Sequence, residues 1–207
     1  MQKEPKAAVA ASHAAGGLVI ADEVQPGFGR TGAAFWGFAR HGITPDVVTM
    51  GKPMGNGVPI GAAVASEALM RGFADEVGYF NTFGGNPVSS AAALAVIDEI
   101  EERGLMANAA DVGRYMLEGL RQVGRSHDAI GQVRGAGLYV GVEIVDGAGA
   151  PDAAAATSII NALRERNILI GAAGLYGNVL KIRPPLVLER VHADMLFDAL
   201  DGVLTGT

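Results

Sequence analysis

The chain has 207 residues, with 16 Lys and Arg against 22 Asp and Glu, so its formal net charge is -6. This acidic balance, without any basic block, argues against nucleic acid as a main partner. The absence of cysteine excludes disulfides, thiolate nucleophiles and zinc sites built on cysteine.

Three short apolar runs in the first third of the chain predict strands. Residues 18–24, LVIADEV, turn from apolar to acidic, as a buried parallel strand does when its C-terminal end opens into a site. Residues 46–50, DVVTM, repeat this form and lead into Gly51 and Lys52. Residues 60–66, IGAAVAS, form the third candidate.

The segment after the first strand contains Gly27, Gly29 and Gly32 in the spacing of a dinucleotide-binding turn. In such a turn the first glycine follows the strand directly, whereas here Asp22 and Glu23 stand at the strand end and would repel a pyrophosphate. We therefore expect a glycine-rich loop without a dinucleotide role.

Two helices follow. Asn86 and Pro87 have the residue types of an N-cap and first helical position, and the apolar run up to Asp98 predicts a buried helix that Gly104 ends. The next helix has one apolar stripe: Met106, Ala109, Gly113, Met116, Leu120 and Val123. Residues 77–97 are uncharged but include Asn, Thr, Pro and Ser, so we do not expect a membrane span.

The pattern changes after about residue 125 to short strands between helices, which predicts a separate α+β unit. Strands are expected within 132–145, at 168–171 and at 178–186, and helices at 152–167 and 189–204. In the last helix, four apolar residues are expected to face inward: Met195, Leu196, Ala199 and Val203.

Asp22 and Lys52 each follow an apolar strand, at the end where open α/β sheets place their ligands. Lys52 has the apolar neighbours Met50, Pro53 and Met54, and poor solvation would favour its neutral, nucleophilic amine. A carboxylate and a lysine of this kind meet the two demands of pyridoxal phosphate (PLP): an acid for the ring nitrogen and an amine for the aldehyde. A structural Asp–Lys ion pair is the alternative reading.

The sequence resembles the class III aminotransferases, the ornithine and 4-aminobutyrate type. The resemblance rests on GGLVIADEVQPGFGRTG, PDVVTMGKPMGNGVPIGAAV, NTFGGNPVSSAAALAVIDEI and NVLKIRPPL, which occur in the family's order. It implies an α/β protein of fold type I, the C-terminal part of a large parallel-sheet domain followed by a small α+β domain. The expected division is residues 1–115 and 116–207.

The resemblance implies a role for each matching residue. Asp22 would bind the pyridinium nitrogen of PLP, and Lys52 would form the Schiff base and shuttle protons. Val24 would pack on the cofactor ring, and Gln25 would lie near its phenolic oxygen. Thr82 would bind the cofactor phosphate of the neighbouring subunit in a homodimer with a shared active site. Without such roles, Val24 is a core residue, Gln25 a surface residue and Thr82 a turn residue.

One position departs from the family pattern. Lys181 in NVLKIRPPL stands where many relatives have an arginine for the substrate carboxylate, and Arg183 lies two residues further. Lysine lacks the bidentate fork of arginine, and a basic group there suits a carboxylate or a phosphate. The motifs are most similar to the branch that contains alanine–glyoxylate aminotransferases and phosphoethanolamine phospho-lyases. Both transfer of an amino group to an oxo acid and elimination of phosphate remain open.

Family members are much longer than this chain, because they carry a phosphate-binding segment and further strands upstream of the Asp strand. We therefore expect this chain to be the C-terminal half of an enzyme, located in the cytoplasm, with no metal and no membrane partner. As a third alternative, the chain alone is an inert fragment that needs its N-terminal half.

Overall fold

The structure, a computed structural model, describes residues 4–206. It divides into two compact units, Met1–Met106 and Ala107–Thr207, and the division falls within one helix. The predicted domain division at about residue 115 concerns the domains of a complete enzyme and stays a prediction.

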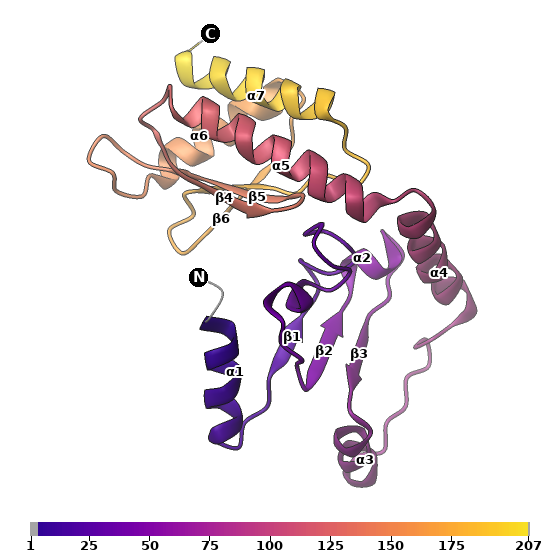
Figure 1. The fold of residues 1–207 in the computed structure, drawn as a ribbon. Helices are drawn as coiled ribbons and strands as arrows, with labels where there is room; N and C mark the ends of the chain where they lie inside the picture. Colours follow the sequence, from indigo (N-terminus) through magenta and orange to yellow (C-terminus); the bar gives the residue numbers. More distant parts are fainter. Residues whose placement is uncertain (1–3, 207) are drawn as a thin grey trace. The chain divides into compact units, whose positions relative to one another are not determined.

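Unit 1 contains a three-stranded sheet in the order β1-β2-β3. Figure 1 shows α2 at one end of these strands and α3 at the opposite end. The elements in chain order are α1 (Glu4–Ala14), β1 (Ile20–Asp22), the 3₁₀ helix η1 (Gly37–His41), β2 (Val47–Met50), α2 (Lys52–Gly55), β3 (Ala62–Ala65), α3 (Glu67–Glu76) and α4 (Pro87–Glu102).

The three strands lie where the sequence predicts them, with shorter bounds. β1 and β2 are parallel, as expected, but β3 runs antiparallel to β2. The reason is the short connection of residues 51–61, since a parallel return needs a crossover of about a dozen residues or more. The helix α3 was not predicted. Ser66 caps it by accepting a hydrogen bond from the Leu69 amide.

The helix α4 begins as predicted, because the Asn86 side chain accepts a hydrogen bond from the Ser89 amide at 3.0 Å. Its predicted burial is wrong for this structure: Val88 is 77% exposed and Leu94 62%. The same holds for β1, where Ile20 is 62% exposed. A helix that is apolar on several faces needs cover on several sides, and among the described residues of unit 1 the buried apolar side chains are few: Phe28, Ala93, Ile100 and Leu105.

Unit 2 is a four-stranded antiparallel sheet in the order β4-β5-β7-β6. Its helices lie on one face of the sheet (Figure 1). The elements are α5 (Leu105–Gly124), β4 (Ile130–Ala136), β5 (Tyr139–Ile144), α6 (Ala153–Glu165), β6 (Gly171–Ala173), β7 (Val179–Ile182) and α7 (Arg190–Thr205). The short strand predicted at 168–171 begins only at Gly171.

The core of unit 2 joins this sheet to the three helices. The α5 stripe is confirmed from Ala109 to Leu120, which are fully buried with Met116 at 1% exposed between them, but its first member, Met106, is 36% exposed. On α7, however, the inward prediction for Met195 is wrong, since it is 56% exposed. Ala193, Leu196 and Leu200 form the buried face, and Met195 is rotated by about 100° from Leu196.

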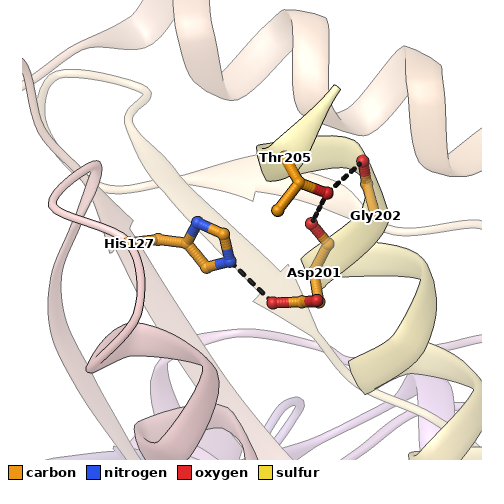
Figure 2. Close-up of polar contacts among 4 residues, drawn as sticks. All are labelled: His127, Asp201, Gly202 and Thr205. Carbon is orange, nitrogen blue, oxygen red and sulfur yellow. Dashed lines mark hydrogen bonds and ion pairs between the residues drawn. The ribbon is translucent and has the colours of Figure 1, made fainter. Parts of the chain in front are cut away.

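Polar contacts hold the C-terminal end of α7 (Figure 2). His127, in the turn before β4, lies 2.7 Å from Asp201, and the Thr205 hydroxyl donates to the Asp201 carbonyl at 2.9 Å. His127 is thus engaged in a structural contact.

Within residues 4–206, no cluster of three or more potential ligands could hold a metal ion, and no helix combines the length and the apolar character needed to cross a bilayer.

Candidate active site

The parallel ladder of β1 and β2 brings the two charged residues of interest to one end of the sheet. Asp22 is in register with Thr49, and the ladder continues when the Glu23 amide donates to the Thr49 carbonyl at 2.8 Å. Lys52 lies three residues beyond Thr49, as the first residue of α2. Since parallel strands end at the same edge, Asp22 and Lys52 share the carboxyl edge of the sheet.

Asp22 is exposed, and its backbone turn is held locally. Its Oδ1 accepts a hydrogen bond from the Val24 amide at 3.0 Å. The turn begins at Val24, after Glu23, whose amide still belongs to the ladder. A carboxylate at such an open strand end is available to a cationic group of a ligand.

Lys52 is exposed as well, so the expectation of a poorly solvated amine is wrong for this structure. The physical reason is its position: α2 has only one turn, and its first residue has no preceding helical turn to cover it. The apolar neighbours Met50, Pro53 and Met54 are half-buried instead.

Val24 lies beside the turn that carries Lys52. A Cβ placed on Gly51 would lie 3.6 Å from Val24 Cγ2, an ordinary van der Waals contact. The structure therefore brings Asp22, Val24 and Lys52 together at one edge, with half-buried Gln25 next in the loop.

The glycine-rich loop forms successive tight turns. Phe28 and Gly29 both have positive φ, 58° and 74°, and the Gly29 amide donates to the Phe35 carbonyl at 2.9 Å. Phe28 is 4% exposed and packs on the rings of Phe35 and Trp36, with centroids 5.1 and 5.5 Å away. The next helical element after the loop is η1, which begins at Gly37.

Sequence reasoning missed Glu23. It is 1% exposed, and its carboxylate accepts from the amides of Gly37 and Phe38 at 2.7 and 2.8 Å. Composition does not separate Glu23 from Asp22, since both are carboxylates at a strand end. The alternation of sides along a strand is the one pattern that could have done so.

Thr82 lies outside this group, in the exposed segment that follows α3. Large aromatic side chains surround it in sequence: Tyr79 is 71% exposed, Phe80 86% and Phe83 79%.

Lys181 and Arg183 lie in unit 2, where both line a pocket of about 400 Å³. Lys181 is on β7, between Gly141 and Gly171 of the adjacent strands. A Cβ on Gly171 would lie 3.8 Å from Lys181 Cε, so the lysine stem lies along this glycine. His192 also lines the pocket, and the rest of the wall is mainly apolar, from residues such as Ile168, Leu169 and Leu196.

Comparison with known proteins adds the family. The aminotransferase class-III family matches residues 6–204. Alanine–glyoxylate aminotransferase 2 homolog 2 of Arabidopsis thaliana, named as mitochondrial, is 49% identical over 189 residues, which are 90% of this chain and 39% of the relative. Ethanolamine-phosphate phospho-lyase homolog 1 of Caenorhabditis elegans is 42% identical over 92% of this chain and 42% of its own length.

Solved structures agree in fold. A phospholyase from Arthrobacter in complex with phosphoethanolamine superimposes with a TM-score of 0.90 and 48% identity, over 94% of this chain and 47% of that one. An aminotransferase of Bacillus anthracis gives a TM-score of 0.91 and 32% identity, over 100% of this chain and 48% of that one.

The fold is therefore that of the fold type I PLP-dependent transferases. The chain belongs to the class-III aminotransferase family, and the comparisons support PLP as the cofactor of that family. It spans about two fifths of the length of the curated relatives and about half of the solved structures.

Proposed function

We propose that this chain carries the Asp–Lys part of a PLP-dependent aminotransferase site, in which an amino group passes from an amine or amino acid to a 2-oxo acid. The observation that carries the proposal is the register of β1 and β2, which puts Asp22 and Lys52 at one sheet edge. Their carboxylate and amine are the donor set that PLP requires.

The chain's own groups have separate tasks in this proposal. Asp22 would hold a proton at the ring nitrogen. Lys52 Nζ would condense with the cofactor aldehyde, releasing water, and once a substrate amine displaces it the free amine would move protons at the substrate carbon. Val24 would fix the ring plane, and Gln25 would lie near the phenolic oxygen. When bound, PLP supplies an electron sink that stabilises negative charge on that carbon.

Borohydride trapping tests the assignment of Lys52. The protein is incubated with PLP, reduced and digested, and mass spectrometry locates the reduced cofactor. We expect the label on the peptide that contains Lys52 and no label in Lys52→Ala. Lys6→Ala, on the exposed side of α1, is the matched control and keeps the label. A full label in Lys52→Ala would contradict the assignment.

A second candidate activity is elimination of phosphate from a phosphorylated amino alcohol. The pocket walls with Lys181 and Arg183 favour an anionic substrate, and a phospholyase with phosphoethanolamine is among the similar structures. The two reactions differ in product. Release of inorganic phosphate from O-phosphoethanolamine supports the lyase, while amine transfer to pyruvate or glyoxylate without phosphate release supports the aminotransferase.

The third alternative concerns the chain alone. Exposed Ile20, Val88 and Leu94 leave apolar faces of unit 1 uncovered, and the solved relatives have about twice this length. We propose that the catalytic form includes polypeptide equivalent to the rest of those relatives. Light scattering and PLP titration of the 207-residue chain test this. A monomer that binds PLP at micromolar concentration and turns over an amine would contradict it.

We further propose a homodimer with a shared site, in which Thr82 of one subunit binds the cofactor phosphate of the other. The exposed aromatic segment around Thr82 supports a subunit contact. Mixing Lys52→Ala with Thr82→Ala protein tests it, because hybrid dimers then contain one intact site. Recovered activity supports the shared arrangement, and no recovery beyond the two separate variants contradicts it.

The cytoplasmic location belongs to the same proposal. Two curated relatives carry a mitochondrial location in their names, so cell fractionation with an antibody to this chain distinguishes the two compartments.

A further inference from the structure

Two adjacent carboxylates at the end of β1 have opposite environments. Asp22 is exposed, whereas Glu23 is 1% exposed. Asp22 ends β1 and the Glu23 amide continues the ladder, so these two side chains point to opposite sides. Val24 follows in the turn and lies near Gly51, since a Cβ placed on Gly51 would be 3.6 Å from Val24 Cγ2.

The Glu23 carboxylate is fully engaged by two successive amides at the start of η1. Oε2 accepts from Gly37 at 2.7 Å, and Oε1 accepts from Phe38 at 2.8 Å. Hydrogen bonds to a charged acceptor are stronger than neutral ones. Loss of this acceptor would also leave the Gly37 amide without its partner in a buried place.

The Glu23 backbone is held as well. Its amide donates to the Thr49 carbonyl at 2.8 Å, and its carbonyl accepts from the Gly27 amide at 3.2 Å. A Cβ on Gly27 would lie 2.7 Å from the Glu23 carbonyl oxygen, and one on Gly37 would lie 2.4 Å from Pro26 Cβ. The position of Glu23 therefore depends on glycine at residues 27 and 37.

We infer that Glu23 is a positioning residue: its buried carboxylate ties the loop to β1 so that Asp22 and Val24 emerge on the cofactor side in a fixed orientation. The part of this inference that concerns the cofactor rests on the function proposed above. The part that concerns Asp22 is a property of the chain without cofactor. The competing explanation is that the hydrogen bonds of Glu23 hold the loop without affecting the orientation of Asp22.

The first experiment uses the protein without PLP. Amide NMR measures the protection of Gly37, Phe38 and Val24 against hydrogen exchange. The protection of the Val24 amide, which donates to Asp22 Oδ1, is here called the Val24 response. In Glu23→Gln we expect faster exchange of the Gly37 and Phe38 amides and at least a halved response of Val24. Ile100→Val, a mild core change elsewhere in unit 1, keeps the wild-type response.

The second experiment is a double-mutant cycle on the dissociation constant of PLP. Glu23→Gln should raise the dissociation constant of PLP by about tenfold in the wild-type background. The increase should be less than about twofold when Asp22 is already Asn, because the two changes act through one contact. Equal losses in both backgrounds would overturn the inference. So would an unchanged Val24 response in Glu23→Gln.

The two proposals fail differently. If the wild-type chain alone takes no PLP, the cycle is run on the protein assembled with the further polypeptide proposed above. Absence of PLP there defeats the proposed function, and the Val24 response of the chain alone still decides the role of Glu23. If Glu23→Gln does not fold, Phe38→Pro replaces it, since that change removes one of the two donors and leaves the carboxylate in place. The expected result is again a smaller Val24 response, and an unchanged one overturns the inference.

Discussion

Gly113 of α5 packs directly on Gly137 of the turn between β4 and β5. A Cβ on Gly113 would lie 2.3 Å from the carbonyl carbon and oxygen of Gly137. No side chain fits between these two backbones, so helix and hairpin are in contact without any intervening atoms.

Gly113→Ala should therefore destabilise unit 2, although alanine ordinarily favours a helix by about 1 kcal/mol over glycine. We expect a loss of about 1–3 kcal/mol in urea unfolding, because the turn must move away. Gly119→Ala meets the Phe197 ring, which can rotate, and should cost less. Gly72→Ala, with no atom within 4 Å of the added carbon, should not destabilise. An equal effect of all three would refute the steric account.

Asn178 provides a second test of unit 2. It is 2% exposed, and its side-chain amide donates to the Ile144 carbonyl at 2.8 Å. Asn178→Ala should lower stability by about 1 kcal/mol. Asn178→Asp should lower it further near neutral pH, since a carboxylate would then face a carbonyl oxygen, and acid should relieve part of this loss. Identical unfolding of the two variants at all pH values would show that the amide contact is unimportant.

The environment of Tyr115 predicts that the stability of unit 2 falls at alkaline pH. Its hydroxyl donates to Asp194 at 2.6 Å, and this hydrogen bond, with burial and the Asp194 charge, raises the pKa of Tyr115 above its ordinary value of about 10. The neutral phenol is thus favoured by folding. Its contribution to stability is complete below pH 10 and is lost as pH rises through the raised pKa.

Ultraviolet titration of the phenolates measures the ionisation of Tyr115. The chain has 4 tyrosines, so loss of one step in a variant can be assigned to the residue that was changed. Tyr115→Phe should remove the ionisation step at the highest pH and make alkaline unfolding less steep. Removal of an ordinary step, with the highest one left intact, would contradict the assignment. Tyr176→Phe, an exposed position, is the control.

The uncovered face of α4 gives a prediction about assembly. Val88→Thr and Leu94→Gln replace exposed apolar side chains, so they should reduce binding of an apolar dye without lowering the stability of the isolated chain. In a form assembled with the further polypeptide proposed above, the same changes should weaken that assembly. A matched loss of stability in the isolated chain would mean that α4 is already covered there.

The sequence predicted local features better than burial. Helix α4 has its cap at Asn86, and the α5 stripe is buried from Ala109 onward as its spacing indicates, because these signals lie within a few residues of each other. The exposure of Val88 and Ile20 could not be predicted from their neighbours in sequence, because burial depends on segments that are distant in the sequence or on other chains. The antiparallel β3 was predictable in principle from its short connection.

The two charged residues of the candidate site could be predicted from the sequence, but the contacts that hold them in place could not. Asp22 and Lys52 follow from strand ends that are visible in the sequence. The anchoring role of Glu23 depends on Gly37 and Phe38, which are 14 and 15 residues away, and their approach is a result of the folded loop. The poor solvation expected of Lys52 failed for the opposite reason, since apolar neighbours in sequence do not cover a residue that starts a one-turn helix.

The shared ladder of β1 and β2 also limits how Asp22 and Lys52 can move. One is tied to Thr49 by register, and the other follows Thr49 by three residues, so the ladder between them acts as a common support. A motion that separates the ends of β1 and β2 releases the Glu23 amide from the Thr49 carbonyl. The rate of deuterium uptake at the Glu23 amide would therefore report how often this edge of the sheet opens.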